Sequence, residues 1–316
     1  MNRMKVVEYN RFGPAEVAQV CERDRPVPGP RQVLVRVHAA ALNPKDLMLR
    51  KGKWWFLTGL RFPKRMGYDF AGEVVALGSR AQGFQVGDNV FGMVRSFRGR
   101  ALAEYVCVAS NELAPKPNGL AWEDAAALPL AALTALQSLR DVARLKPGER
   151  VLINGASGGV GVFAVQIAKA LGAHVTAASS PANRQLVEQL GCDRWLDYAA
   201  EDIFAASGGY SVILDAFGNR SFAAARKALS AHGTYVSTVP SMRLAIDVLR
   251  TRGRRQRAGL VVVQSRKPDL LSLSKWVSSQ QLRAVVDSVY PLADVVAAQS
   301  RLETKRARGK IVLRVA

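Results

Sequence analysis

The pattern of apolar and polar positions changes near residue 122. Before it, short alternating runs are separated by glycine-rich turns, which is typical of antiparallel strands. Residues 31–39, RQVLVRVHA, alternate throughout: Val35 and Val37 share an apolar face, and His38 lies on the opposite face, toward solvent or a polar neighbour. Further strands are expected at residues 69–77, 85–91 and 103–108. Residues 1–122 are therefore predicted to form a mostly β domain.

The remaining chain alternates between apolar strands and helical patterns. An alanine-rich helical segment at residues 122–144 leads into this part. Strand and helix alternation with right-handed crossovers predicts an α/β domain at residues 123–264, with a doubly wound parallel sheet of six strands. Residues 265–316 are expected to return to the first domain. The strands are expected at residues 151–154, 174–178, 194–196, 211–216, 233–238 and 259–263, the helices at 182–190 and 220–230, and the returning segment as a helix from 269, a strand at 284–289, a helix from 293 and a strand at 310–315.

A glycine-rich turn at residues 154–161 joins the first of these strands to a helix. It reads Ala156-x-Gly158-x-x-Gly161, one alanine away from the GxGxxG pattern of dinucleotide-binding turns. Glycine at the second position lets the backbone approach a pyrophosphate, glycine at the third lets helix and strand pack closely, and the amides at the helix start attract anions. The residues of the turn that we expect to bind the cofactor are Ser157, Gly158, Gly159 and Val160.

The same turn also contains Gly155-x-Ser157-x-Gly159, which matches the nucleophile elbow of α/β-hydrolases. Asp215 and His232 follow in the order of a hydrolase triad. The all-small turn, however, serves phosphate binding and is superfluous for a strained serine. A hydrolase is thus the weaker interpretation, and loss of all esterase-type activity in Ser157→Ala would support it.

The end of the second strand of this domain indicates which dinucleotide is bound. NAD sites usually place a carboxylate there, on the adenosine ribose. Here the segment from Ser179 to Arg184 reads SSPANR and has no carboxylate to repel a third phosphate. NADPH is therefore expected to be the cofactor, although the two serines could also cap the next helix.

The composition bears on the number of domains, on membrane spans and on the location of the protein. The 316 residues are 49% hydrophobic, enough for two domains, and no stretch of about 18 apolar residues predicts a spanning helix. With no apolar signal core at the start and three cysteines far apart, a cytoplasmic location is expected.

The net charge is +20, with a local concentration in LRTRGRRQR from Leu249. We interpret it as a solvated surface. Nucleic acid or an anionic membrane could be attracted, but no aromatic residues are interleaved there, so no nucleic-acid partner is expected.

Eight collinear motifs resemble those of the medium-chain dehydrogenase/reductase superfamily, in its zinc-independent quinone oxidoreductase branch. The pattern is most similar to the reticulon-interacting mitochondrial oxidoreductase and chloroplast enone reductase types. The resemblance implies a GroES-like catalytic domain, built from both chain ends, around a Rossmann domain, and a homodimer. The motifs are VLVRVHAAALNPKD, MGYDFAGEVVALG, VGDNVFG, AEYVCV, AALPLAALTAL, LINGASGGVGVFAVQIAKALGA, LDAFGN and ARGKIVL.

The resemblance also indicates where a metal would be. Zinc alcohol dehydrogenases of this superfamily bind their catalytic metal through Cys and His. The corresponding positions here are Asn43 and Tyr68, neither of which is a good zinc ligand, so no metal is expected. Without a Lewis acid, a conjugated acceptor is a better substrate than a simple alcohol. Tyr68 could donate a proton to the developing enolate or could merely fill the vacated space.

Further site residues follow from the resemblance alone. Asn43 and Tyr68 are the candidate catalytic residues, and Asn43 and Thr134 are expected near the nicotinamide. The simpler alternatives are a local turn for Asn43, a helix cap for Thr134 and loop packing for Tyr198. Asp46 and Asp69 are expected to be structural hydrogen-bond acceptors. The residues expected near the adenosine phosphate end, the ribose and the phosphates are Ser179, Ser180, Asn183, Arg184, Tyr198, Phe217, Gly218 and Lys310.

The resulting hypothesis is hydride transfer from NADPH to a quinone or an α,β-unsaturated carbonyl, a reaction of EC 1.6.5 or 1.3.1 type. The second hypothesis is a non-catalytic NADPH-binding regulator whose basic surface meets another macromolecule. The aromatic cluster at Trp54–Leu57 could line a pocket for quinone rings, form core or an oligomer contact, or touch a membrane without stable insertion. The sequence leaves open the physiological acceptor, the proton donor, the oligomeric state and a partner for the charge.

Overall fold

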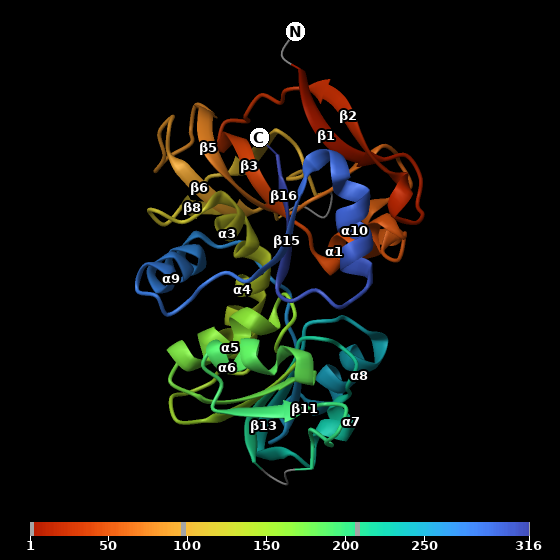
Figure 1. Cartoon of the computed structure of the whole chain (residues 1–316), viewed down its shortest axis with the longest axis vertical. Coiled ribbons are helices and arrows are strands. Elements are labelled where there is room, and N and C mark those ends of the chain that lie inside the picture. Colours follow the sequence, from red (N-terminus) through yellow and green to blue (C-terminus); the bar gives the residue numbers. More distant parts are fainter. Residues whose placement is uncertain (1–2, 96–98, 206–208, 316) are drawn as a thin grey trace. The chain divides into compact units, whose positions relative to one another are not determined.

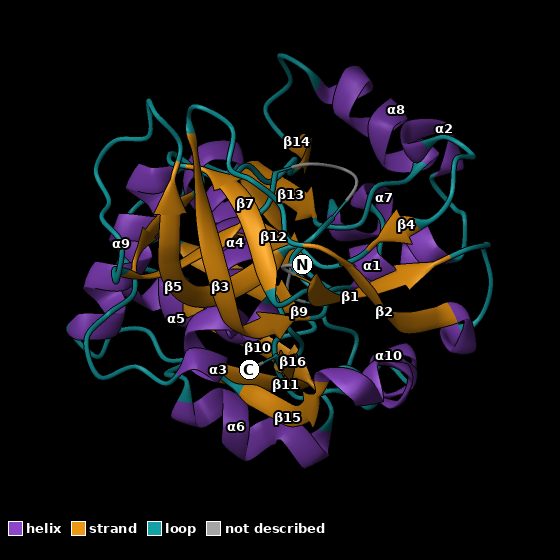
Figure 2. Cartoon of the chain, turned by 90° about the horizontal axis from the view of Figure 1, so that it is seen from above, coloured by secondary structure: helices purple, strands orange, loops and turns teal. Residues whose placement is uncertain are grey.

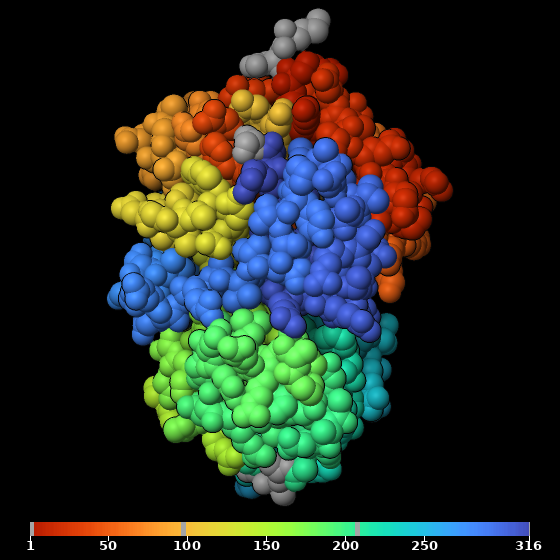
Figure 3. Space-filling view, in the orientation of Figure 1, coloured from red at the N-terminus to blue at the C-terminus, as the bar shows by residue number. Residues whose placement is uncertain are grey.

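The computed structural model describes residues 3–95, 99–205 and 209–315, and the chain divides into two compact units (Figure 1). Unit 1 comprises Met1–Leu130, Gln264–Ser279 and Arg283–Ala316. Unit 2 comprises Ala131–Val263 and Gln280–Leu282. Unit 1 is thus assembled from both ends of the chain, and the blue C-terminal segment packs directly beside the red N-terminal segments on its surface (Figure 3). None of the described helices is both long and apolar enough to cross a lipid bilayer.

Unit 1 is built on two sheets. The larger has the strand order β15-β16-β3-β5-β6-β8, with β7 also paired to β3, and the smaller has the order β2-β1-β4. Only β15 and β16 run parallel among these pairs of described strands. The strands are β1 (Arg3–Tyr9), β2 (Ala18–Asp24), β3 (Gln32–Ala41), β4 (Lys64–Arg65), β5 (Asp69–Leu77), β6 (Asn89–Met93), β7 (Tyr105–Ala109), β8 (Leu113–Pro115), β15 (Val286–Pro291) and β16 (Lys310–Arg314), and the helices are η1 (Ala15–Val17), α1 (Pro44–Arg50), α2 (Trp55–Thr58), α3 (Trp122–Ala127), α9 (Lys267–Ser278), η4 (Leu292–Asp294) and α10 (Val295–Glu303).

The central strand β3 follows the predicted alternation. Val35 and Val37 are fully buried and belong to the main core of unit 1. His38, expected to face solvent or a polar group, instead stacks on Trp122 with ring centroids 4.4 Å apart. The reason is that α3 packs against β3, which covers the face of the sheet that alternation alone leaves open.

Unit 2 is the predicted doubly wound domain. All six strands are parallel, in the order β11-β10-β9-β12-β13-β14, which is the Rossmann order. Helices α5 and α6 cover one face of the sheet, and α7 and α8 cover the other (Figures 1 and 2). The strands are β9 (Arg150–Asn154), β10 (His174–Ser179), β11 (Arg194–Asp197), β12 (Tyr210–Asp215), β13 (Leu229–Ser237) and β14 (Arg257–Leu260), and the helices are η2 (Gln137–Val142, a π-helical turn), α5 (Gly161–Ala170), η3 (Pro181–Asn183), α6 (Arg184–Gln189), α7 (Phe222–Ala225) and α8 (Met242–Thr251), with α4 (Pro129–Leu136) crossing from unit 1.

Two expected helices differ in the structure. The helix predicted at 220–230 is confined to α7, because Leu229 already pairs with Tyr210 at the start of β13. The helical segment predicted at 122–144 is divided, since Pro129 lacks the amide that would continue α3. Helix-favouring composition was thus misleading at 226–230, whereas the segment predicted at 122–144 is helical as expected and is only divided at Pro129.

Candidate active site

Three polar side chains meet inside unit 1 in what we call the Asp69 cluster, formed by Asn43, Asp69 and Lys310. The Lys310 ammonium donates to the carboxamide oxygen of Asn43 at 2.5 Å, to the backbone oxygen of Leu42 at 3.1 Å and to the carboxylate of Asp69 at 3.2 Å. The Asn43 amide nitrogen donates to the same carboxylate oxygen at 2.9 Å. All three side chains are almost completely buried. The cluster is therefore an ion pair whose donors and acceptors are matched inside the protein.

The sheet register explains why these residues meet. Ala41, at the end of β3, pairs with Asp69 of β5 on one side and with Val312 of β16 on the other. The segment that follows β3 and leads into α1 therefore begins next to both β5 and β16, the two strands that carry Asp69 and Lys310. The other carboxylate oxygen of Asp69 accepts the backbone amide of Leu130 at 2.7 Å. Three segments distant in sequence are joined through this one carboxylate.

Asp46 is a second buried carboxylate, in the first turn of α1. Its two oxygens accept the backbone amides of Asn43 and Gly67, each at 2.9 Å. Burial raises the pKa of Asp46 to about 6 despite these hydrogen bonds. The expectation that Asp46 and Asp69 accept structural hydrogen bonds is confirmed.

Asp46 is expected to make stability depend on pH. Because its folded pKa of about 6 lies above the ordinary 3.8, the folded state binds the proton more tightly, so this group's contribution to stability falls as pH rises from about 4 to 6. In Asp46→Asn that slope is lost, and the free energy of unfolding at neutral pH falls by about 1–3 kcal/mol because one backbone amide loses its acceptor. Urea denaturation at several pH values measures both. Asp24→Asn, at an 85% exposed carboxylate, is the control and should change neither; an unaltered slope in Asp46→Asn would contradict the prediction.

Tyr68 precedes Asp69 and is also buried in unit 1. The Lys45 ammonium lies 3.8 Å from the centre of its ring. Burial, and then the negative charge of Asp46, raise the pKa of the Tyr68 phenol above its ordinary value of 10. Burial also lowers the pKa of Lys45. The phenol is thus protonated at neutral pH and can act as a hydrogen-bond donor. The contact with Lys45 was not predicted from the sequence, because it depends on how the sheet brings α1 next to β5.

The glycine-rich turn of unit 2 has the geometry that its sequence predicts. It follows β9 directly and leads into α5, whose first amides lack acceptors within the helix. Gly155 has a φ of +78°. A Cβ atom on Gly161 would lie 2.1 Å from the backbone oxygen of Gly155, whereas one on Gly158 would lie 3.4 Å from that oxygen. Packing therefore requires glycine at position 161, whereas packing alone does not require it at position 158.

This contrast gives a prediction for the two glycines. Gly161→Ala is expected to lower the free energy of unfolding of unit 2 by about 1–3 kcal/mol, because the clashing partner is backbone that cannot rotate away. Gly158→Ala is expected to leave stability within about 0.5 kcal/mol and to weaken nucleotide binding at least about tenfold, because its methyl group stands where a phosphate would approach. Thermal unfolding and NADPH titration by fluorescence separate the two effects. Equal losses of stability in both variants would contradict it.

At the carboxyl end of β10, the predicted nucleotide residues lie together. Asn183 donates to the hydroxyls of Ser157 at 2.9 Å and Ser180 at 3.2 Å. The buried Asn183 Oδ1 has no hydrogen-bond partner among the described residues, so one acceptor in this group is unused. The Ser179 hydroxyl is already engaged, since it accepts from the Trp195 indole at 3.0 Å and donates to the backbone oxygen of Ser180.

The remaining predicted residues lie around this group or elsewhere. Arg184 pairs with Glu188 at 2.8 Å and lies 5.0 Å over the Trp195 ring. Tyr198 follows β11 and is half-exposed, and Thr134 is buried in α4. Within unit 2 the structure thus brings Ser157, Ser180 and Asn183 together. Lys310, expected at the phosphates, has its partners in the Asp69 cluster, and its role toward a cofactor stays a prediction.

Asp215, at the carboxyl end of β12, organises the turn containing Phe217 and Gly218. Its carboxylate accepts from the Asn154 amide at 2.8 Å, the Gly218 amide at 2.8 Å and the Tyr235 hydroxyl at 2.9 Å. Gly218 has a φ of +77°, and Phe217 is 50% exposed. The roles of Asn154 and Tyr235 were missed in the sequence, where the only signal was a carboxylate at the end of a buried strand. Phe217 is thereby held at the surface on a rigid turn.

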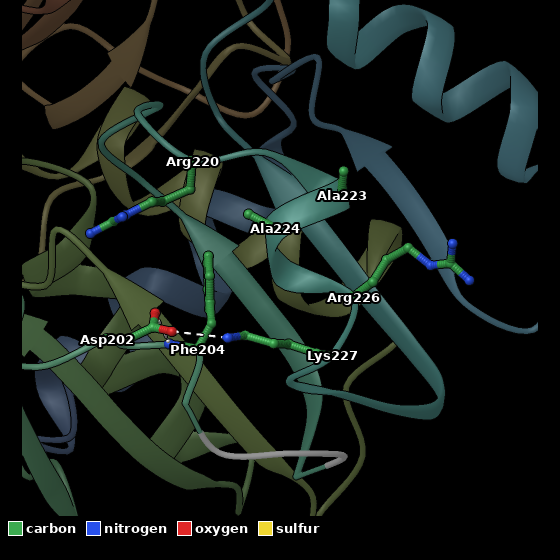
Figure 4. Close-up of a pocket in the computed structure, with 7 residues that line it drawn as sticks. All are labelled: Asp202, Phe204, Arg220, Ala223, Ala224, Arg226 and Lys227. Atoms are coloured by element: carbon green, nitrogen blue, oxygen red, sulfur yellow. Dashed lines mark hydrogen bonds and ion pairs between the residues drawn. The ribbon is translucent and has the colours of Figure 1, made fainter.

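Unit 2 also has a surface hollow of about 480 Å³ beside α7 (Figure 4). Asp202 and Lys227 in its wall form an ion pair of 3.0 Å, and the guanidinium carbon of Arg220 lies 5.9 Å from the centre of the Phe204 ring. None of the residues predicted for the site lines it. The hollow is therefore distinct from the nucleotide residues described above.

Comparisons with known proteins agree with this arrangement. A family model described as an alcohol dehydrogenase GroES-like domain matches residues 29–118, and one described as a zinc-binding dehydrogenase matches residues 190–313. The mitochondrial NAD(P)H oxidoreductase RTN4IP1 of Bos taurus is 32% identical over 90% of this chain and 82% of that protein. The 2-methylene-furan-3-one reductase of Solanum lycopersicum is 33% identical over 99% of this chain and 79% of that protein. The solved quinone oxidoreductase from Coxiella burnetii is 33% identical, with a TM-score of 0.92 over 99% of this chain and 100% of the other.

The chain belongs to the medium-chain dehydrogenase/reductase superfamily. Within it, the chain is a homologue of the quinone oxidoreductase branch, and the predicted combination of a GroES-like domain with a Rossmann domain is confirmed.

One family model names zinc, so the residues present were tested against that metal. At the two positions that the family resemblance assigns to metal ligands, this chain has an amide, Asn43, and a phenol, Tyr68. The Asn43 oxygen already accepts from a buried ammonium, that of Lys310. In the described part of the chain, no three His, Cys, Asp or Glu side chains are grouped to hold a metal ion. This donor set does not fit a tetrahedral zinc site.

Proposed function

We propose that this chain transfers hydride from NADPH to a quinone or to an α,β-unsaturated carbonyl compound. The observation that carries the proposal is the Asp69 cluster, where the carboxamide oxygen of Asn43, at one of the positions that the family resemblance assigns to a metal ligand, already accepts from the ammonium of Lys310. A carbonyl that no metal polarises must spread the incoming negative charge through its own π-system. Quinones and enones do this, and simple ketones and aldehydes do not. The names of the relatives support the same two substrate classes.

The chain's own residues would bind the cofactor and manage one proton. The amides at the start of α5 and the glycine-rich turn suit a pyrophosphate, and Asn183 suits a ribose hydroxyl. The bound cofactor supplies the hydride, and the reduced acceptor then takes up a proton. Tyr68 is the proposed donor, because its phenol is protonated at neutral pH and its hydroxyl could hydrogen-bond to a developing enolate oxygen and transfer the proton to it. Water would return a proton to the phenolate.

Arg184 is the proposed contact for the additional phosphate that distinguishes NADPH from NADH. It now pairs with Glu188 on the surface, and a phosphate of about −2 charge would compete for the guanidinium. In Arg184→Gln, kcat/KM with NADPH is expected to fall about tenfold while the value with NADH stays unchanged, since one charge-assisted hydrogen bond is lost. Arg194→Gln, at a similarly exposed arginine in β11 paired with Glu201, is the matched control. A parallel loss with both cofactors would contradict the assignment.

The deciding experiment offers the purified protein a panel of acceptors with NADPH and with NADH. Oxidation of NADPH, followed at 340 nm as the usual absorbance of reduced nicotinamide, is expected with benzoquinones, naphthoquinones and short enones, and not with saturated aldehydes. Elemental analysis of the same preparation should find no stoichiometric zinc. NADPH binding without turnover on any acceptor would favour the second hypothesis, a regulator that binds NADPH. The arginine-rich segment after Leu249 is the observation that favours that alternative.

A further inference from the structure

Helix α8 in unit 2 has two opposite apolar faces. Leu244 is buried in the core beneath the helix, and Val248 packs against the same core. On the other side, Met242 is 79% exposed and Leu249 is 72% exposed, with Ile246 between them at 40%. At about 100° per residue, these three lie roughly half a turn from the buried face. We call Met242, Ile246 and Leu249 the α8 stripe.

Arginine residues flank the α8 stripe. Arg243 and Arg250 lie on the helix, and three more follow its end within five residues. They are Arg252, Arg254 and Arg255, all exposed. Among the residues of α8, all of which the structure describes, Asp247 is the one that carries a carboxylate. The exposed side of α8 is thus apolar along the α8 stripe and positively charged beside the stripe and at the end of the helix.

A hollow of about 610 Å³ opens on the flank of α8, next to the stripe's basic border at Arg250. Arg226, Arg250, Arg254 and Arg255 line it together with Asp247. Among the described residues, no carboxylate forms an ion pair with any of these four arginines; Arg226 contacts the Gln256 amide oxygen at 3.4 Å. Guanidinium groups that converge without carboxylate partners are suited to phosphate oxygens.

From this combination we infer that α8 docks the protein on the surface of an anionic phospholipid bilayer. The helix lies in the plane of the interface, the α8 stripe enters the boundary between headgroups and acyl chains, and the arginine-lined hollow receives headgroup phosphates. Helices with an apolar face and a basic border bind membranes in this manner. Figure 2 shows α8 at the outer edge of unit 2, away from β9 and β10, the strands that the predicted nucleotide-binding residues follow.

Two other partners match the surface less well. Nucleic acid would use the arginines but gives no role to exposed methionine and leucine side chains, and no aromatic residue lies on this helix for base stacking. A second copy of the chain would bury the stripe but would bring two arginine clusters together, which is electrostatically unfavourable. An anionic bilayer can contact both the apolar α8 stripe and the arginines beside it.

The test is co-sedimentation of the full-length protein with vesicles. We expect binding to vesicles of phosphatidylcholine with about 30% phosphatidylserine and none to phosphatidylcholine alone, with loss of binding as salt is raised. The triple variant Arg250→Gln, Arg254→Gln, Arg255→Gln is expected to bind about 100-fold more weakly, since each arginine near an anionic surface contributes on the order of a fivefold factor. The double variant Met242→Gln, Leu249→Gln is expected to bind at least about tenfold more weakly without any change in charge.

Matched controls separate this docking from the net charge alone. Arg11→Gln, Arg31→Gln, Arg80→Gln removes three exposed arginines from unit 1, and Val27→Gln removes an 88% exposed apolar side chain there. Both should bind vesicles as the native chain does, and all variants should keep their thermal unfolding temperature. Equal weakening by the arginine control would overturn the proposal, as would unchanged vesicle binding by the double variant. So would a variant that loses only dimer formation in ultracentrifugation, or only binding to a labelled DNA duplex.

Discussion

Replacing Lys310 with methionine is expected to lower the free energy of unfolding of unit 1 by about 3–5 kcal/mol. The substitution keeps the length of the side chain and removes the ammonium, so the fully buried carboxylate of Asp69 loses its charge partner and the Asn43 oxygen loses a donor. Urea denaturation followed by tryptophan fluorescence measures the change, because four of the five tryptophans, all except Trp195, lie in unit 1.

The double variant Asp69→Asn, Lys310→Met is the internal control. It removes both charges, and we expect it to recover most of the stability lost in Lys310→Met, as a double-mutant cycle would show. The single-variant defect should also shrink at low pH. Burial raises the pKa of Asp69 and Lys310 holds it down, so without Lys310 the folded state binds a proton more tightly and gains stability as pH falls. A defect that is identical at pH 5 and pH 8, or a double variant as unstable as the single one, would show that the ion pair is not what stabilises this edge of the sheet.

Tyr68→Phe is expected to lower kcat on an accepted enone about 100-fold with little change in the KM for NADPH. General acid catalysis typically contributes a factor on the order of 10² or more, and the substitution removes only the hydroxyl. The ring, and with it the Lys45 ammonium at 3.8 Å, stays in place. Steady-state kinetics with NADPH and one enone checks the expectation, alongside thermal unfolding to confirm that the variant is folded.

Tyr105→Phe provides a matched comparison. Tyr105 also lies in unit 1, in β7, and has a cationic group over its ring, since the Arg25 guanidinium is 3.9 Å from the centroid. It should retain full activity. If Tyr68→Phe turns over the enone as fast as the native chain does, Tyr68 only fills space, and the proton must come from another hydroxyl or from water.

The fold was predictable from the sequence because its elements are strongly periodic. The strand predicted at residues 69–77 is β5, and the six strands of unit 2 are all present, in the order that right-handed crossovers require. What failed was local: the helix predicted at 220–230 gave way to β13 at Leu229, where pairing with Tyr210 outweighs the helical preference of alanine and lysine. The composition of residues 220–230 favours a helix, but pairing with a neighbouring strand determines the conformation at Leu229.

The candidate site was predictable only where its residues are close in sequence. The glycine-rich turn and the serines after β10 follow the strands that position them, and their chemistry can be inferred from spacing. The Asp69 cluster joins Asn43 to Lys310 across 267 residues, and no periodic pattern connects them. Nor does a pattern predict that Lys45 lies over Tyr68, because that contact depends on how α1 and β5 are brought together by the sheet.

The position of Lys310 has a consequence for how the protein is made. A ribosome releases Asn43 and Asp69 long before it releases β16, while all six strands of unit 2 emerge between them. Unit 2 can therefore complete its sheet before β16 is synthesised, whereas unit 1 must wait for β16, because until then the carboxylate of Asp69 lacks the ammonium of Lys310. A chain that stops before β16 would contain all six strands of unit 2 but would leave the carboxylate of Asp69 in unit 1 without its charge partner.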